Sequence, residues 1–414
     1  MAERRAFCSV RWWKMISSPL LTALERDEEF LASVLRSTCG EPHIRIDRIE
    51  ILRRSQDTQD LSDSVTRVVV SGRKGKQLNE FSKTLLIKRH PEHSSRHPAQ
   101  RDPAFCNEAV VYSRVLPSLL QCGEGDCEPL LRTPICLHAS TSVIVLEDMV
   151  SLGFTTGNRV KGLDFDHAAA ALQALGRFHA VSLSLKHQDK SAFDRVTSQV
   201  QEVVFVPEAA PVFGASLESA LELAISSLKK CPEMVIFEAV QMLQSLRGRT
   251  FRTLVSLAAP REPLSVICHG DFWINNIMFS YKNDKIDDVV LTDLQVVRYS
   301  SLANDILHFL HTSLEPGLSR EYSEDLIKVY HKSLSETMKK IAPSSPTVTL
   351  EEILDEIESH ALYGLLMSFL VLPSITDSAK DSQGRTDFYC DSFSLMYSQR
   401  VKSLVLEFVE KGFI

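Results

Sequence analysis

The stretch from residue 264 to residue 294 constrains this chain most strongly. It is a short β-type interruption in a half of the sequence whose pattern is otherwise helical. Residues 266–279 read Val-Ile-Cys-His-Gly-Asp-Phe-Trp-Ile-Asn-Asn-Ile-Met-Phe, and residues 289–295 read Val-Val-Leu-Thr-Asp-Leu-Gln. An apolar strand therefore leads into a polar loop, and a hairpin with its turn at residues 281–285 follows. We predict that polar side chains of the loop and of the hairpin end lie close together.

Three oxygen-bearing side chains occupy these positions, Asp271, Asn276 and Asp293. Phosphoryl transfer uses such a set, because one carboxylate orients and deprotonates the attacking hydroxyl while an amide and a second carboxylate hold magnesium on the phosphates. Oxygen ligands suit the hard Mg²⁺ ion. The tripeptide His-Gly-Asp alone is common, but the asparagine and the strand-borne aspartate that follow it make the combination specific. The segment predicts a site for ATP and Mg²⁺.

The same segment resembles the kinase-like superfamily of small-molecule phosphotransferases that includes choline and aminoglycoside kinases. Within that superfamily it is most similar to the ecdysteroid kinase-like family of arthropods. The resemblance covers most of the chain and is carried by residues 269–279, 291–295, 145–149 and the Gly-Phe pair at 153–154. It implies an α+β, bilobed protein-kinase-like fold with a small β-rich N-lobe and a large, mostly helical C-lobe. It also implies transfer of the γ-phosphate of ATP to a hydroxyl group.

The resemblance assigns roles to the residues of the loop and hairpin. These are Asp271 as the general base, His269 as a support of its loop, and Asn276 and Asp293 as the magnesium ligands. Asn276 is preferred to Asn275 because the family's metal ligand lies five residues after the catalytic aspartate. Asp305 matches a carboxylate that braces the catalytic loop in the superfamily, and the alternative is that it caps the helix that begins there.

The ATP-binding residues are expected upstream of the loop. Lys88, at the end of a strand, is expected to reach the α- and β-phosphates, and Glu108 on the following helix is its natural partner. The resemblance places Glu147 and Met149 in the linker whose backbone meets adenine.

The turn expected to cover the phosphates departs from the usual pattern, because residues 59–65 contain no glycine. Glycine lets backbone N–H groups approach a phosphate closely. Ser62 and Ser64 would make these contacts here, partly through their hydroxyls, while Asp60 and Asp63 add negative charge. The alternative function is therefore a non-catalytic pseudokinase that binds a steroid or lipid on the same scaffold.

The periodicity of the sequence divides the chain into three parts. Residues 1–43 form a helical extension with a helix over 17–37, residues 44–149 form the N-lobe, and residues 150–414 form the C-lobe. The N-lobe contains five strands, a turn at Gly72–Gly75 and one helix over residues 103–120. Helices of the C-lobe are expected at residues 166–186, 217–230, 233–257, 320–341, 349–371 and 397–411.

Composition excludes several classes of protein. The net charge of -7 argues against a nucleic-acid partner. The nine scattered cysteines do not suggest a secreted disulfide framework. The N-terminus has no apolar core of a signal peptide, and the longest apolar-rich stretch, residues 361–373, is shorter than the roughly 20 residues of a membrane span. We expect a cytoplasmic enzyme with no obligate protein partner.

The acceptor is expected to be a small-molecule alcohol. Gly270 stands where many protein kinases carry an arginine, and the segment between Asp293 and the next helix is short. Both features argue against a protein kinase. The resemblance implies an ecdysteroid or another lipophilic alcohol, including a detoxification substrate. Aromatic residues could line its pocket or belong to the core; they are Phe193, Phe205, Phe213, Tyr363 and Tyr389. His308 and His311, on the apolar face of a predicted helix, are interpreted as core or boundary residues.

Overall fold

The computed structural model describes residues 18–52, 65–90, 102–120, 131–376 and 395–414. The chain is an α+β protein that divides into two compact units. The first unit contains Met1–Asp102 and Pro134–Leu152, and the second contains Pro103–Thr133 and Gly153–Ile414. In the described part of the chain, the helix over residues 18–39 groups with the sheet of the first unit, and the helical residues 103–120, which we expected in the N-lobe, group with the second unit.

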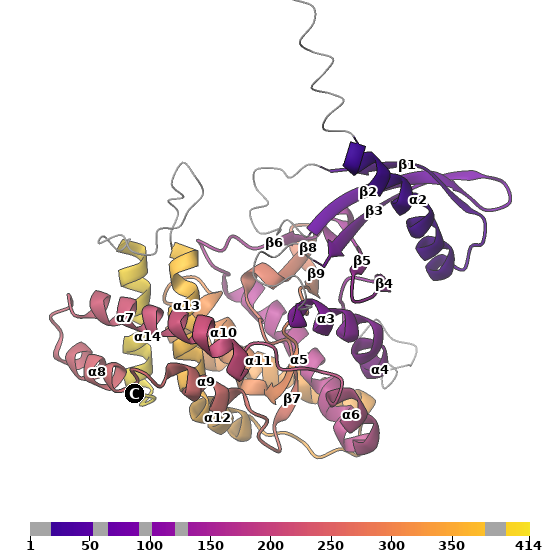
Figure 1. Ribbon diagram of the computed structural model, residues 1–414. Helices are drawn as coiled ribbons and strands as arrows, with labels where there is room; N and C mark the ends of the chain where they lie inside the picture. The colour runs from indigo at the N-terminus through magenta and orange to yellow at the C-terminus, as the bar shows by residue number, and fades with distance from the viewer. Residues whose placement is uncertain (1–17, 53–64, 91–101, 121–130, 377–394) are drawn as a thin grey trace, which may run out of the picture. The chain divides into compact units, whose positions relative to one another are not determined.

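The first unit is built on a five-stranded antiparallel sheet in the order β1-β2-β3-β5-β4 (Figure 1). Its elements are α2 (Ser18–Cys39), β1 (Ile44–Ile51), β2 (Val65–Lys74), β3 (Asn79–Arg89), β4 (Cys136–Ala139), β5 (Val143–Glu147) and the short helix η3 (Met149–Leu152). The predicted five strands are all present, and β3 pairs with both β2 and β5.

Helix α2 packs on one face of this sheet. Leu31 and Leu35 of α2 are buried in one cluster with alternate strand residues, which include Leu85 and Ile87 of β3. Each fully buried leucine or isoleucine of this kind contributes about 1.5–3 kcal/mol through removal from water. Because successive side chains of a strand point to opposite faces, Lys88 lies on the face of β3 that does not carry this cluster.

The turn between β2 and β3 begins at Gly75, and the prediction that it begins at Gly72 is wrong. Gly72 belongs to β2 and lies opposite a register shift between Ile46 and Arg48 of β1. A Cβ atom on Gly72 would lie 2.0 Å from the carbonyl oxygen of Arg45. Glycine is needed there because two strands approach closely at a bulge, not because the chain reverses.

The second unit is mostly helical, and its two longest helices, α5 and α11, lie side by side. Its helices are α3 (Pro103–Val110), η1 (Val111–Val115), α4 (Leu116–Leu120), α5 (Phe165–Gln188), α6 (Lys190–Thr197), η4 (Pro207–Ala209), η5 (Ala210–Gly214), α7 (Ala215–Leu228), α8 (Met234–Ser245), α9 (Thr250–Ala258), η6 (Ile274–Asn276), α10 (Leu302–Thr312), α11 (Leu318–Ile341), α12 (Leu350–Ser359), α13 (Ala361–Thr376) and α14 (Leu395–Glu410).

Two long predicted helices are each divided in the structure. The helix expected over residues 233–257 is split into α8 and α9 by a turn that contains Gly248 at φ +69°. The helix expected over residues 349–371 is split into α12 and α13 at His360. Helix α6 was not predicted, and Asp189 explains its start: this residue follows α5 and its carboxylate accepts the N–H of Ala192 in α6.

Two small sheets of the second unit carry the segment singled out by the sequence. Strand β7 (Ser265–Cys268) pairs with β10 (Arg298–Ser301), and β8 (Ile277–Lys282) pairs with β6 (Thr155–Thr156) and β9 (Lys285–Leu291). The predicted hairpin turn is formed by Asn283 and Asp284, at φ 52° and 58°. Both residues tolerate the left-handed region, which a tight hairpin requires.

Most of the aromatic residues considered for an acceptor pocket are core residues in the structure. Phe205 and Tyr363 are buried in the same helical cluster, against which Phe213 packs, and Phe193 is also buried. Tyr389 lies outside the described residues.

Within the described ranges, no single helix is long and apolar enough to cross a membrane. The pair α12 and α13 satisfies the length and composition of a span only when the two are taken together, and they are bent by 59° relative to each other.

Candidate active site

The predicted catalytic loop begins where β7 ends, and His269 ties it to the hairpin. The imidazole is fully buried. Its Nε2 lies 2.9 Å from the carbonyl oxygen of Thr292, and its Nδ1 lies 3.3 Å from the backbone nitrogen of Asp271. The tautomer protonated at Nε2 satisfies both contacts, because Nδ1 then accepts the N–H of Asp271. His269 therefore links the loop to the residue that precedes Asp293.

Gly270 is required by the path of this loop. Its φ is +82°, in the region that residues with a side chain rarely adopt. A Cβ atom at this position would also lie 2.1 Å from the carbonyl oxygen of Val296. No side chain fits here, which explains in physical terms why the chain has no arginine between His269 and Asp271.

Asp271 and Asn276 are in direct contact. The Asn276 side-chain nitrogen donates to Asp271 Oδ2 at 2.8 Å and to the Asp271 carbonyl oxygen at 2.9 Å. The backbone carbonyl oxygen of Asn276 accepts hydrogen bonds from the backbone nitrogen of Thr292 at 2.9 Å and from the Thr292 hydroxyl at 3.2 Å. Asn276 thus fixes the Asp271 side chain and holds the end of the hairpin beside the loop.

Asp293 follows Thr292 directly and has an unusual backbone conformation. Its φ is +61°, and its Oδ2 accepts a hydrogen bond from the Gln295 side chain at 3.3 Å. A non-glycine residue in the left-handed region costs energy, and such residues are found often at functional sites. Asp293 directly follows Thr292, whose backbone nitrogen and hydroxyl are hydrogen-bonded to the backbone carbonyl oxygen of Asn276.

The Asp305 carboxylate accepts two hydrogen bonds from the backbone of the loop. Its Oδ2 accepts the N–H of His269 at 2.7 Å and its Oδ1 accepts the N–H of Gly270 at 2.9 Å. The cap of α10 is a different residue, Ser301, whose side chain accepts the N–H of Ala303. Of the two roles open for Asp305, contact with the loop is the one present in the structure.

A chain of buried hydrogen bonds supports Asp305. His179 of α5 lies 3.1 Å from Asp305 Oδ2 through Nε2 and 2.8 Å from the Tyr330 hydroxyl of α11 through Nδ1. Burial favours the protonated form of Asp305, but the His179 contact and the Gly270 N–H outweigh it, so the pKa of Asp305 lies below its usual value.

His179 and Asp305 also lie near Cys268, a spacing compatible with a metal site. Each ligand atom already has another partner. The Cys268 thiol points at the carbonyl oxygens of Ser300 and Ser301, at 3.4 and 3.3 Å. Burial raises the pKa of Cys268 well above its usual value, which disfavours the thiolate that a metal would need. We interpret this cluster as structural support for the loop.

His308 of α10 is the closest charged or polar neighbour of Asp271 that the sequence analysis did not assign to the site. Its Nε2 lies 3.4 Å from Asp271 Oδ1, and its side chain is only 2% exposed, against 32% for Asp271. The contact does not meet hydrogen-bond geometry, and within the described part of the chain neither ring nitrogen has a hydrogen-bond partner. The interpretation of His308 as an ordinary core residue is therefore incomplete, because it faces the predicted base.

The environment of Asp271 favours its ionised form. Burial raises its pKa, but the nearby imidazoles of His308 and His269 and the hydrogen bond from Asn276 outweigh that effect. The pKa of Asp271 therefore lies below its usual value. The carboxylate is charged at neutral pH and available to accept a hydrogen bond from a hydroxyl group.

The predicted ATP-binding residues lie in both units. Lys88 lies in β3, where it pairs with Val65 and Ile144, and Glu108 is a buried residue of α3 in the second unit. Glu147 ends β5 and Met149 begins η3. Ser62 and Ser64 lie outside the described residues.

The linker after β5 is held on both sides. The N–H of Glu147 donates to the carbonyl oxygen of Ile135 at 2.9 Å, and the Glu147 carboxylate lies 3.7 Å from the Lys83 ammonium. Asp148 is buried and pairs with Arg67 at 3.0 Å. The N–H of Glu147 is therefore already engaged in a hydrogen bond within the first unit.

The sequence profile of the ecdysteroid kinase-like family matches residues 61–342. The chain belongs to this family. No curated protein matches it by sequence.

Solved structures of low similarity include three kinases of small molecules. The ethanolamine kinase of Plasmodium vivax is 12% identical over 89% of this chain and 84% of that chain, with a TM-score of 0.44. Choline kinase LicA from Streptococcus pneumoniae is 12% identical over 93% and 99%, with a TM-score of 0.38. The aminoglycoside phosphotransferase APH(3'')-Id from Streptomyces rimosus is 14% identical over 82% and 97%, with a TM-score of 0.28. These values are too low to carry an argument about function.

Asn107 is a second residue of this ecdysteroid kinase-like protein that the sequence analysis missed. Its side-chain nitrogen donates to the carbonyl oxygens of Gln295 and Val297 at 3.1 and 2.9 Å, and its side-chain oxygen accepts the N–H of Gln201 at 3.0 Å. Asn107 therefore joins α3, the helix of Glu108, to the segment after Asp293. An asparagine in a helix gives no signal of such long-range contacts.

A sequence signal for His308 did exist. It stands three residues after Asp305, and residues at this spacing lie on the same face of a helix. A helix that turns Asp305 toward the loop therefore also turns His308 toward it. The apolar neighbours Ile306, Leu307 and Phe309 concealed this signal, because they make the whole segment resemble a core helix.

Proposed function

We propose that this ecdysteroid kinase-like protein transfers the γ-phosphoryl group of ATP to the hydroxyl group of a small lipophilic alcohol. The observation that carries the proposal is the contact of Asp271 with Asn276, in a loop that Asp305 and His269 hold from two sides. A loop fixed in this way can present one carboxylate to a substrate without reorganisation. Such preorganised positioning supplies most of the catalysis in phosphoryl transfer.

Asp271 is the proposed base. Its ionised carboxylate accepts a hydrogen bond from the acceptor hydroxyl and orients the oxygen toward the γ-phosphorus. As the new oxygen–phosphorus bond forms, the bond between the γ-phosphorus and the bridging oxygen of ATP breaks and ADP leaves. The hydroxyl proton passes to Asp271. A carboxylate with a low pKa is adequate, because the loose transition state of this reaction demands orientation more than base strength.

Asn276 and Asp293 are the proposed ligands of Mg²⁺. Both hydrogens of the Asn276 amide are donated to Asp271, so the amide oxygen is the atom that remains for a cation. The donor set of an amide oxygen and carboxylate oxygens fits a hard divalent ion. When bound, Mg²⁺ would neutralise charge on the phosphates. Two hydrogen bonds from Thr292, the residue before Asp293, to the backbone carbonyl oxygen of Asn276 support this pairing of the two ligands.

Lys88 is proposed to bind the α- and β-phosphates and Glu108 to hold Lys88, with the linker of Glu147 and Met149 at the adenine. Ser62 and Ser64 are proposed to cover the phosphates. The fully buried position of the Glu108 side chain supports a role for its charge, because a carboxylate is rarely buried without a cationic or hydrogen-bonding partner.

The family supports an ecdysteroid, or a related lipophilic alcohol including a detoxification substrate, as the acceptor. The test is ATP consumption and product formation with a panel of ecdysteroids, other sterols, choline and xenobiotic alcohols, with and without Mg²⁺. We expect Mg²⁺-dependent phosphorylation of at least one lipophilic alcohol. Steroid binding with no phosphorylation of any alcohol would instead support the non-catalytic pseudokinase that the glycine-free segment suggests.

A further inference from the structure

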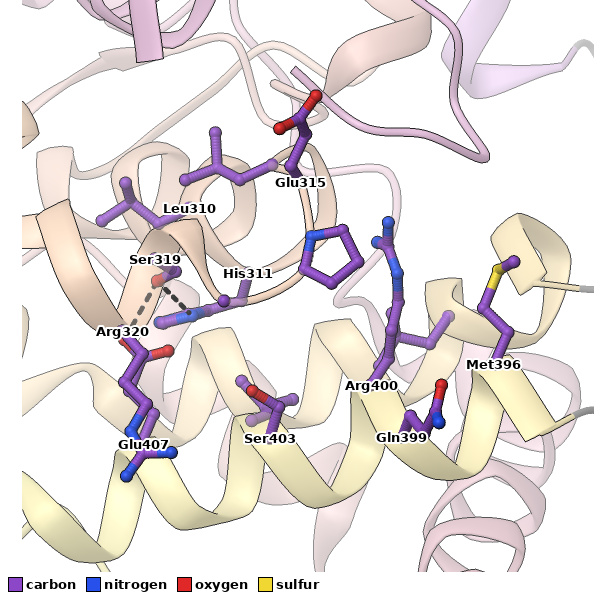
Figure 2. Close-up of a pocket in the computed structure, with 15 residues that line it drawn as sticks. Leu310, His311, Glu315, Ser319, Arg320, Met396, Gln399, Arg400, Ser403 and Glu407 are labelled. Atoms are coloured by element: carbon purple, nitrogen blue, oxygen red, sulfur yellow. Dashed lines mark hydrogen bonds between the residues drawn. The ribbon is translucent and has the colours of Figure 1, made fainter. Parts of the chain in front are cut away.

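The second unit contains a pocket of about 350 Å³ that is separate from the residues proposed for catalysis (Figure 2). It lies where the end of α10, the start of α11 and the end of α13 face α14. Much of its wall is apolar, and these residues are Leu310, Leu314, Pro316, Leu372, Met396 and Leu404. Pockets of this size bind small organic molecules, and their few polar groups decide which molecules they accept.

Most charges in this pocket are already neutralised. Three of its four charged side chains have counter-ions: Glu315 pairs with Lys161 at 3.0 Å, Glu407 with Lys411 at 2.6 Å, and Arg320 with Glu410 at 2.7 Å. His311 adds no charge at neutral pH, because burial lowers its pKa to about 4. Its Nδ1 lies 3.4 Å from the hydroxyl of Ser319, which donates to Glu407.

Arg400 is the fourth charged residue, and it forms no ion pair with any described residue. In the described ranges, its guanidinium group has one hydrogen bond, from a terminal nitrogen to the carbonyl oxygen of Val160 at 3.3 Å. Its Nε is buried and has no hydrogen-bond partner in those ranges. The residue is 8% exposed, and burial lowers its pKa. A buried cation without a counter-ion is costly and uncommon in a folded protein.

The direction of the Arg400 side chain shows where a counter-ion could reach its guanidinium group. In Figure 2 it extends from α14 across the pocket toward the chain segment of Glu315, while the carboxylate of Glu315 points away from it. An anionic group that enters the pocket would therefore meet the free edge of a guanidinium group. Arginine binds carboxylates and similar oxyanions through two parallel hydrogen bonds, which are stronger than bonds between neutral groups.

We propose that this pocket binds a small amphipathic organic anion, whose acidic head pairs with Arg400 and whose apolar body lies against the leucine-rich wall. The proposal goes beyond phosphoryl transfer, because none of its contacts involves the catalytic loop. A bound anion would supply the counter-ion that Arg400 lacks among the described residues.

The test uses the full-length protein and three unbranched probes of ten carbon atoms each, namely decanoate, decanol and decylamine, in titration calorimetry. We expect wild type to bind decanoate more tightly than either other probe. Arg400→Met should weaken decanoate binding by about tenfold or more, because a charge-assisted hydrogen bond of roughly 1.5–3 kcal/mol is lost. Arg320→Met is the matched control, since Arg320 lines the same pocket but is already paired with Glu410. It should leave decanoate binding within about twofold of wild type.

A second variant keeps the test decisive if Arg400→Met unfolds, which circular dichroism would reveal. Ser403→Phe leaves Arg400 in place and fills the pocket from α14, so it should also abolish decanoate binding. The proposal is overturned if wild type does not bind decanoate, if decanol binds as tightly as decanoate, or if a folded Arg400→Met variant binds decanoate as wild type does.

Discussion

The imidazole of His308 lies 3.4 Å from the carboxylate of Asp271, with the histidine buried and the aspartate partly exposed. The histidine belongs to α10, whose first turn carries Asp305, and Asp305 holds the backbone of the same loop. One helix therefore contacts both the backbone and the side chain of the proposed catalytic loop. Among the described residues, neither ring nitrogen of His308 has a hydrogen-bond partner, and the imidazole faces the Asp271 carboxylate.

Replacing His308 tests whether it positions and tunes Asp271. His308→Leu should raise the pKa of Asp271, because the imidazole is a main cause of its lowered value. The acid limb of the pH profile of kcat/KM should then move to higher pH, since protonated Asp271 cannot accept the hydroxyl proton. His311→Leu, on the same helix but facing the pocket, is the control. An acid limb that stays in place in a folded His308→Leu variant would show that His308 only fills space.

Much of the site follows from the sequence because its parts are local. The order of strand, polar loop and hairpin predicts the contact of Asp271 with Asn276, since the two lie within one short loop. The same order places Asp293 at the strand end. The sequence leaves two roles open for Asp305, because a carboxylate at the start of a helix can cap that helix or accept hydrogen bonds from the backbone of another segment. Only the tertiary fold decides between them.

Other features depend on contacts between distant segments and leave little trace in the sequence. Gly72 and Gly75 both suggest a turn, yet only one lies in it, because the requirement at Gly72 comes from the carbonyl oxygen of Arg45 on another strand. Asn107 and the pair His179 and Tyr330 act across many residues of the chain. Polar residues on helices are usually solvated, so the buried contacts of Asn107 with the segment after Asp293, and of His179 with Asp305 and Tyr330, could not be expected from pattern alone.

Asp293→Ala should weaken nucleotide binding in the presence of Mg²⁺ and change it little in the presence of EDTA, because the variant loses a ligand for the cation and not for the nucleotide. Titration calorimetry with ATP under both conditions measures this difference. Asp287→Ala removes an exposed carboxylate of the same hairpin and should behave as wild type. Equal losses with and without Mg²⁺ would argue against Asp293 as a metal ligand.

Gly270→Ala should destabilise the protein and abolish turnover. The new Cβ meets the carbonyl oxygen of Val296, and the left-handed backbone alone costs roughly 1–2 kcal/mol for a residue with a side chain. Gly248→Ala separates the two effects, because Gly248 also has a positive φ but no atom within 4 Å of the added Cβ. Urea unfolding should show a larger loss for Gly270→Ala. Similar losses of unfolding free energy in the two variants would mean that the loop accommodates the added Cβ atom by a small backbone shift.

The ionised form of Asp305 should stabilise the fold in a pH-dependent way. Its folded-state pKa lies below the ordinary value of 3.8. Its contribution is therefore fully present above that pH and is lost as the pH falls through the folded-state pKa. Asp305→Asn should cost roughly 1–3 kcal/mol at neutral pH, because one loop N–H loses its acceptor. In urea unfolding, the difference from wild type should narrow in acid. A difference that is independent of pH would show that the charge is unimportant.

Asp271→Asn gives the most direct test of the central claim, because it changes one carboxylate oxygen to a nitrogen and keeps the size of the side chain. With the best acceptor from the alcohol panel and saturating ATP and Mg²⁺, phosphate transfer should fall by about 10²–10⁴-fold, while the affinity for ATP stays near that of wild type. Asn275→Ala, a neighbour in the same loop with no proposed role, should retain most of the activity. A folded Asp271→Asn variant that turns over at a rate near wild type would contradict the account.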